Sequence, residues 1–462
     1  MVYDRPGDGL ELIEMINRGA HFMLIVTLAL AITGCRAVHA PAMHQAMGAS
    51  ETNSLAVPDA SSNHASDEIW PTRWGDNPEE RGIVVEMDPA KRLRAIHYSR
   101  HHQGRTMPED YEDASSLAKA MGIESAFNFK VEGPGAFLFS ENTISDQPVQ
   151  DPPDLAFRYV SAKVAEPDDA TIDPDKDHVE LERTWFTYRD PKPDREVRGT
   201  LVLLPGMFGT PEPIVDATER YFVNKGYGVL RMLSHPSRYT QHLMLQYLDG
   251  KGDEIASRAA EAADERVAEC AYATDAALDH VFAQRKDMQE MPIVLLGMSG
   301  GAMALPSVYA YTPDRYDAAI LIAGGANFLQ IMIESNYKSW IDAILVDFDP
   351  TSEYLGSPDS GVVDTLASLY LGHAKLDAYH SAPLLFEQNL PTLVLHAKND
   401  KAVPASSGDL LYERLGKPER WEYPFGHEII FATLPTQIPK IETWVREQIQ
   451  GDTADGSMGS GG

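Results

Sequence analysis

The sequence of 462 residues has few cysteines and a deficit of positive charge. Lysine and arginine number 39 against 69 aspartates and glutamates, so the formal net charge is −30 at pH 7. This balance excludes a basic face for nucleic acid or anionic membrane, because such binding relies on neutralising phosphate charge. Of the two cysteines, Cys270 lies in a helical stretch and is expected to be a small core residue.

Long apolar runs are also scarce. The segment 22–32 is strongly apolar but too short to span a bilayer comfortably, and it is typical of the core of a signal peptide. The residues before Met15 are acidic, whereas Arg18 follows it, as a signal peptide requires. We therefore expect translation to start at Met15.

The apolar core ends in Ile32-Thr33-Gly34-Cys35, which resembles a bacterial lipobox. The resemblance implies a signal peptide over residues 1–34 and a lipidated Cys35 as the first mature residue, which would leave no pair of cysteines for a disulfide. The protein is then exported and anchored in the cell envelope through this lipid. The alternative is cleavage after Ala40, which would give a periplasmic or secreted protein.

Composition divides the rest of the chain. Residues 35–68 lack apolar clusters and are expected to form a disordered tether, and the Gly- and Ser-rich residues 451–462 a disordered tail. Residues 69–154 are expected to form an accessory region of unknown fold, with strands near 81–87 and 135–139 and a short helix over 111–121. The main domain is expected over residues 155–450.

Strands and helices alternate in this main domain, which indicates an α/β fold with a mostly parallel central sheet and helices on both faces. Continuous apolar runs predict strands buried on both faces. Expected strands include 200–204, 228–233, 292–296, 318–323, 391–397 and 420–423, and expected helices include 255–284 and 440–448. The alternation breaks over 324–389, where an apolar helix over 328–345 and a second one near 362–371 indicate a helical, lid-like insertion.

The motif Gly297-Met298-Ser299-Gly300-Gly301 follows an apolar strand and precedes a helix of small residues. This is the context of a G-x-S-x-G nucleophile elbow, in which the serine occupies a strained turn and small neighbours let strand and helix pack closely. Ser299 is therefore the candidate nucleophile. A glycine-rich turn without chemistry is the plain alternative.

An acid and a base follow the next strands. Asp400 comes after the strand 391–397, and His427 after the strand 420–423. The carboxyl ends of parallel strands meet at one edge of a sheet, so Ser299, Asp400 and His427 are expected to converge there. Asp347 and Asp349 are weaker candidates for the acid, and His396, inside a strand, is expected to be structural.

Four motifs in this order resemble the α/β-hydrolase family. They are 203–209, the serine motif, Asn399-Asp400-Lys401-Ala402-Val403-Pro404, and Gly426-His427. The resemblance covers about residues 155–450 and implies an α/β-hydrolase fold with a Ser-Asp-His triad. It also implies an oxyanion hole made by the backbone N–H groups of Gly300 and Met207, with Phe208 as the substitute donor. Many relatives carry His-Gly where this chain has Pro205-Gly206, which leaves the second donor open.

These residues predict a serine hydrolase that cleaves a carboxylic ester, a small molecule, through an acyl-enzyme. The expected substrate contacts are Phe208, His235, Met298 and Phe328. A peptidase or amidase, an acyltransferase, or a catalytically silent envelope binding protein remain alternatives. No organic cofactor and no metal are implied, since the acidic run 173–177 lacks the glycine and glutamate of a calcium loop. The natural substrate and the oligomeric state stay open.

Overall fold

The computed structural model divides the chain into two compact units, Met1–Ser61 and Ser62–Gly462. It describes residues 69–72, 82–87, 89, 96–97, 128–131, 137–138, 151–165, 178–206, 210, 212–233, 243–337, 343–349 and 358–455, all in the second unit. The expected signal peptide, Cys35, the tether, the helix over 111–121 and the acidic run 173–177 lie outside the described residues. No helix in these ranges is long and apolar enough to cross a membrane.

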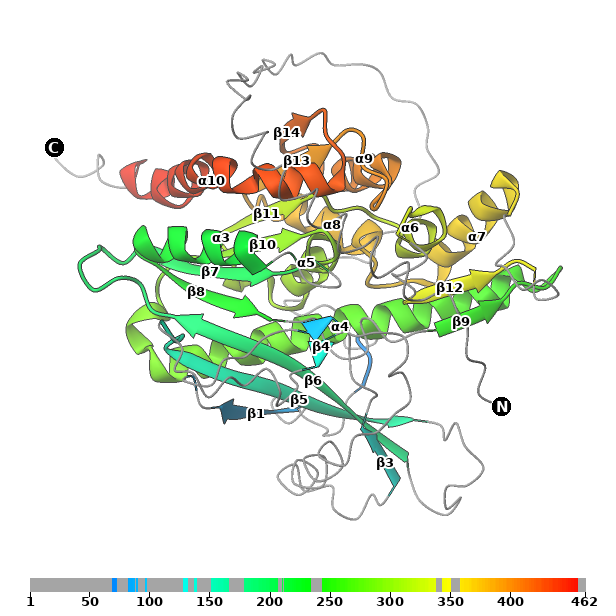
Figure 1. Ribbon diagram of the computed structural model, residues 1–462, viewed down its shortest axis with the longest axis horizontal. Helices are drawn as coiled ribbons and strands as arrows, with labels where there is room; N and C mark the ends of the chain where they lie inside the picture. The colour runs from blue at the N-terminus through cyan, green and yellow to red at the C-terminus, as the bar shows by residue number, and fades with distance from the viewer. Residues whose placement is uncertain are drawn as a thin grey trace, which may run out of the picture. The chain divides into compact units, whose positions relative to one another are not determined.

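One large sheet organises the second unit (Figure 1). Its strands are, in spatial order, β1 (Gly82–Met87), β5 (Leu155–Ala165), β6 (His178–Arg189), β8 (Tyr227–Met232), β7 (Gly199–Leu204), β10 (Ile293–Met298), β11 (Ala318–Ile322), β13 (Thr392–Ala397) and β14 (Glu419–Tyr423). All neighbours from β8 to β14 are parallel, whereas β6 is antiparallel to both β5 and β8. The predicted α/β fold with a mostly parallel sheet is confirmed, and the strand order from β5 to β14 is that of the α/β-hydrolase fold.

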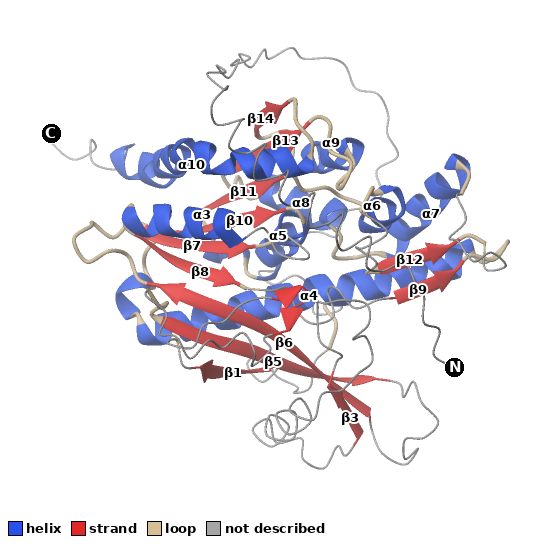
Figure 2. Ribbon diagram, viewed as in Figure 1, coloured by secondary structure: helices blue, strands red, loops and turns tan. Residues whose placement is uncertain are grey.

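Helices cover both faces of this sheet (Figure 2). On one face, α3 (Glu212–Asn224) and α10 (His427–Asp455) enclose one apolar core. On the other, α4 (Gly252–Gln284) and α5 (Gly300–Tyr311) enclose the larger core. Each residue of β7, β10, β11 and β13 is buried, as expected for apolar runs between two helical layers. Helix α10 continues to Asp455, so residues 451–455, predicted to belong to a disordered tail, are helical.

The region before residue 155 contributes to the same sheet rather than forming a separate layer. Strand β1 pairs antiparallel with β5, and β3 (Asn128–Val131) pairs parallel with β6. The short strands β2 (Ile96–His97) and β4 (Phe137–Leu138) pair with each other. Trp70 is buried in the larger core, where it contacts Tyr272 and Tyr311. Described residues on both sides of the predicted boundary at residue 154 thus share one sheet and one core.

The insertion between β11 and β13 differs in part from the prediction. It contains α6 (Phe328–Glu334), β12 (Ile344–Asp347), α7 (Ser360–His373) and α8 (Ala378–Glu387). The single helix expected over 328–345 is wrong, because α6 ends at Glu334 and β12 pairs parallel with β9 (Leu243–Gln246). The insertion packs through α7 on α4 and through α8 on α5 and on α9 (Ala405–Arg414).

Two buried aspartates hold the backbone of the insertion. Asp264 of α4 accepts the N–H groups of Lys375 and Leu376, in the link between α7 and α8, at 2.8 and 2.9 Å. Asp377, which follows Leu376, accepts the N–H groups of Asn327 and Phe328 at the start of α6 at 2.9 and 2.8 Å. The bonds of Asp264 attach the link between α7 and α8 to α4. The bonds of Asp377 hold the start of α6, where a helix leaves N–H groups without an intrahelical partner.

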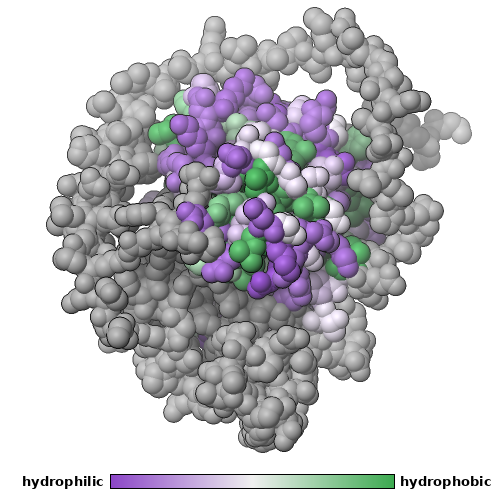
Figure 3. Space-filling model, turned by 90° about the vertical axis from the view of Figure 1, so that its right-hand side faces the viewer, coloured by the Kyte–Doolittle hydropathy of each residue, from purple (hydrophilic) through white to green (hydrophobic). Residues whose placement is uncertain are grey.

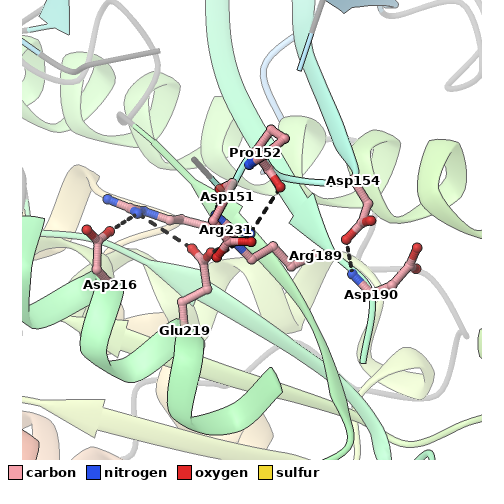
Figure 4. A network of polar contacts seen from close by, with 8 residues as sticks. All are labelled: Asp151, Pro152, Asp154, Arg189, Asp190, Asp216, Glu219 and Arg231. Carbon is pink, nitrogen blue, oxygen red and sulfur yellow. Dashed lines mark hydrogen bonds and ion pairs between the residues drawn. The ribbon is translucent and has the colours of Figure 1, made fainter. Parts of the chain in front are cut away.

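A network of charges joins β6, β8 and α3 (Figure 4). The carboxylate of Glu219, on α3, pairs with Arg189 of β6 and with Arg231 of β8. Arg231 also pairs with Asp216 at 2.8 Å. Glu219 is buried, so this network holds α3 against the antiparallel side of the sheet.

The side of the unit that carries α7, β9 and β12 has apolar residues scattered among polar ones (Figure 3). Met244 of β9 and Leu248 just after it are among the few large apolar residues that are exposed. Isolated apolar side chains of this kind are ordinary on protein surfaces.

Candidate active site

Ser299 occupies the turn between β10 and α5. Its backbone has φ 52° and ψ −114°, a conformation that non-glycine residues rarely adopt. The turn is secured by the Ser299 N–H, which donates to the carbonyl of Ile322 on the neighbouring strand at 2.8 Å. This strained turn therefore places Ser299 at the carboxyl end of the sheet.

The glycines around Ser299 are required by close backbone contacts. A Cβ atom on Gly301 would lie 2.2 Å from the carbonyl oxygen of Leu204, and one on Gly297 would lie 2.6 Å from the carbonyl oxygen of Gly301. Real Cβ atoms do not approach backbone oxygens so closely, and neither backbone can move aside. The motif thus brings the start of α5 against the loop that follows β7.

Asp400 is held by the loop after β13. Its Oδ1 accepts the N–H groups of Ala402 and Val403, both at 2.9 Å, and the residue is only 7% exposed. Both bonds fix the orientation of the carboxylate. With Oδ1 occupied in this way, Oδ2 is the oxygen that faces His427.

His427 begins α10, directly after β14, and connects the other two side chains. Its Nδ1 lies 2.7 Å from Asp400 Oδ2, and its Nε2 lies 3.0 Å from Ser299 Oγ. An Nδ1–H that donates to the carboxylate leaves Nε2 as an acceptor for the serine hydroxyl proton. The structure thus joins the three predicted residues in one hydrogen-bonded chain, which is the arrangement that can activate a serine hydroxyl as a nucleophile.

The expected oxyanion donors are only partly described. Gly300 begins α5 next to Ser299, at the positive end of the helix dipole, where developing negative charge is favoured. Met207 and Phe208 lie outside the described residues. Beside them, the Gly206 N–H donates to the buried Thr210 Oγ1 at 3.1 Å.

Two of the expected substrate contacts are buried in the core. Met298 is 1% exposed and its side chain belongs to the core under α3 and α10, because the alternation of β10 turns it away from Ser299. Phe328 is 5% exposed and packs in the larger core. Both side chains thus lie in apolar cores, and their contact with a substrate stays a prediction. His235 lies outside the described residues.

The residues weighed against the triad lie elsewhere. Asp347 is on β12 and accepts the N–H of Asp349, whereas the carboxylate that pairs with His427 Nδ1 is that of Asp400. His396 is buried in β13 against Gly408 of α9. Burial and the nearby Arg420 guanidinium lower the pKa of His396. Among the residues that the structure describes, no three metal-binding side chains gather to hold an ion.

Sequence patterns did not indicate two aromatic neighbours of His427. The ring of Phe431, one turn further along α10, lies 5.1 Å from the imidazole, centre to centre. The ring of Tyr337, from the insertion, lies 6.0 Å away and is perpendicular to it at 89°. The i, i+4 spacing could have revealed Phe431, but no local signal places Tyr337, 90 residues earlier in the chain, beside His427.

The chain is similar to known proteins only in distant structural matches among those compared. No family model and no curated protein matches the chain. Among solved structures, it is similar to Est1E from Butyrivibrio proteoclasticus, with 15% identity, 62% of this chain and 98% of that chain covered, and a TM-score of 0.37. It is also similar to a Pyrococcus furiosus esterase, with 12% identity, coverage of 58% and 87%, and a TM-score of 0.37. A Pyrococcus horikoshii acylaminoacyl peptidase matches with 14% identity, coverage of 57% and 39%, and a TM-score of 0.33. At these scores the likenesses carry no weight for the reaction.

Proposed function

We propose that this chain is a serine hydrolase that cleaves a carboxylic ester through an acyl-enzyme on Ser299. The observation that supports the proposal most directly is the hydrogen-bonded chain from Ser299 Oγ through His427 to Asp400. A serine hydroxyl is a weak nucleophile by itself, and such a chain supplies both the base and the group that orients it.

In the first half of the reaction, Ser299 Oγ attacks the ester carbonyl carbon while His427 Nε2 takes the hydroxyl proton. Asp400 stabilises the imidazolium that forms. The oxyanion would be bound by the Gly300 N–H and by the N–H of Met207 or Phe208. The tetrahedral intermediate then collapses, the bond to the alcohol oxygen breaks, and His427 returns its proton to that oxygen.

The second half repeats these steps with water. His427 removes a proton from a water molecule, which attacks the acyl carbon, and then returns that proton to Ser299 Oγ as the acid departs. Every proton transfer uses the same Nε2 atom, so no cofactor is needed in this scheme.

A fluorophosphonate probe tests the nucleophile. We expect one probe per chain on Ser299, no labelling of Ser299→Ala, and little of His427→Ala. Ser406→Ala is the matched control, because Ser406 is an exposed serine on α9. Failure of the folded wild type to react would overturn the proposal and favour a binding protein. Turnover of 4-nitrophenyl esters, compared with aminoacyl anilides, then separates an esterase from a peptidase.

We also propose that the protein is exported and carries a lipid on Cys35. The support is the apolar segment 22–32 and the Ile32-Thr33-Gly34-Cys35 motif. Mass spectrometry of the mature N-terminus in a bacterial host would show a diacylglyceryl mass on Cys35. An unmodified terminus at Pro41 would contradict this assignment.

A further inference from the structure

The insertion places one aromatic side chain, that of Tyr337, against the base of the triad. The Asn336 N–H donates to the carbonyl of Lys401, next to Asp400, at 2.9 Å. The Tyr337 N–H donates to the hydroxyl of the buried Ser335 at 3.1 Å. These two bonds hold the backbone of Asn336 and Tyr337, so the place of the Tyr337 side chain is set by the fold.

The two ends of the Tyr337 side chain have separate partners. Its ring lies perpendicular to the imidazole of His427, and its hydroxyl donates a short hydrogen bond to Oε1 of Glu428. Burial and this bond to Glu428 raise the pKa of the Tyr337 phenol far above its usual range, so the phenol keeps its proton. Tyr337 therefore holds the carboxylate of Glu428 near the catalytic base.

Within the described part of the chain, Glu428 forms no ion pair with a cation, and its side chain accepts a hydrogen bond from the Tyr337 hydroxyl. The residue is exposed, in the first turn of α10 and next to His427. A negative charge is favourable at this end of a helix. The result is an accessible carboxylate with a fixed place at the edge of the site.

The chemistry of the reaction decides which part of a substrate meets this carboxylate. His427 Nε2 must come within hydrogen-bond distance of the leaving alcohol oxygen, because it protonates that oxygen. A group on the Nε2 side of the His427 ring consequently borders the alcohol part, whereas the acyl carbonyl faces Gly300.

We propose that Tyr337 and Glu428 form a leaving-group subsite that favours esters whose alcohol carries a positive charge. This inference rests on the proposed ester hydrolysis at Ser299. The carboxylate attracts a cationic alcohol and repels an anionic one. The face of an aromatic ring adds to the binding of an ammonium group.

The test is a series of butyrate esters that differ in the charge of the alcohol. Butyrylcholine, its neutral isostere 3,3-dimethylbutyl butyrate and the butyrate ester of 4-hydroxybutanoate are compared by kcat/KM at low ionic strength. We expect the choline ester to exceed its neutral isostere by about three- to tenfold, as an exposed ion pair and a cation–π contact allow. The anionic ester should be the slowest, and 1 M salt should reduce the differences.

The variants assign the effect to the two residues. Glu428→Gln should bring the ratio of choline to neutral ester near one, and Tyr337→Phe should lower it in part. Glu261→Gln, which removes an exposed carboxylate from α4, should leave the ratio unchanged. Equal rates across the series, or a ratio that Glu428→Gln does not change, would overturn the subsite. Should a variant fail to fold, the effect of salt on the ratio of choline to neutral ester in the wild type tests the subsite instead.

The two proposals fail in different ways. If the probe does not label Ser299, the hydrolase itself is wrong. If the neutral ester is hydrolysed but charge has no influence, only the subsite is wrong. If Ser299 is labelled while the butyrates are not cleaved, tetramethylammonium should still protect Ser299 from the probe better than neopentyl alcohol, and equal protection would overturn the subsite.

Discussion

Replacing Asp400 by asparagine tests the proposed triad more sharply than removing the side chain. The substitution keeps the size of the group and changes one oxygen to an NH₂. Because Oδ1 accepts two backbone N–H groups, from Ala402 and Val403, the amide oxygen is expected to take that place. The NH₂ group must then face Nδ1 of His427.

The opposite orientation is costly. It would turn NH₂ toward two N–H donors and would lose two hydrogen bonds, each worth about 1 kcal/mol, while leaving two buried donors unsatisfied at about 1–3 kcal/mol each. A change of imidazole tautomer costs less. His427 therefore accepts at Nδ1 and carries its proton on Nε2, where it can no longer take the proton of Ser299.

We expect kcat of Asp400→Asn to fall by about 10⁴-fold, as for the same exchange in a serine protease triad. This corresponds to about 5.4 kcal/mol of transition-state free energy. Thermal unfolding should change little, since the hydrogen bonds to the loop persist. Steady-state kinetics on a 4-nitrophenyl ester and the rate of fluorophosphonate labelling measure the loss. A variant that keeps more than about a tenth of wild-type kcat would refute Asp400 as the acid.

Two further predictions concern stability. Glu219→Gln removes a buried carboxylate that pairs with Arg189 and Arg231, and urea unfolding should show a loss of about 3–5 kcal/mol. Asp216→Asn, whose carboxylate is 42% exposed, should cost less than about 1 kcal/mol, and an equal cost for both would contradict this. Burial raises the pKa of Asp264 to about 7, above an unfolded value of about 3.9. The native state thus favours the protonated acid, so the stability of the wild type should decline as pH rises from about 4 through 7. Asp264→Asn should lessen that decline in thermal melts. Parallel pH profiles of the two proteins would contradict this role of Asp264.

Much of the fold was predictable because its signals are local. The apolar runs of β7, β10, β11 and β13 indicate buried parallel strands, and the ends of each lie within two residues of their expected places. The glycines around Ser299 indicate a turn that only small residues allow. The order of Ser299, Asp400 and His427 after successive strands was enough to bring them together, since parallel strands end at one edge.

Other features depend on partners that are distant in the chain. The segment Ile344–Asp347 is apolar enough to continue a helix, but it becomes a strand because β9, about a hundred residues earlier, offers it a parallel edge. Periodicity over 81–87 showed a strand and could not show that β1 would extend the main sheet.

The sequence alone determined the strand-and-helix order, the strained turn at Ser299 and the residue types of the triad, because spacing and glycine placement act within a few residues. Tertiary structure decided what surrounds the triad. It buried Met298 on the far face of the sheet and brought Tyr337 and Glu428 to the edge of His427. Side chains from separate elements meet only when the layers pack, so the spacing of residues along the sequence does not predict their contacts.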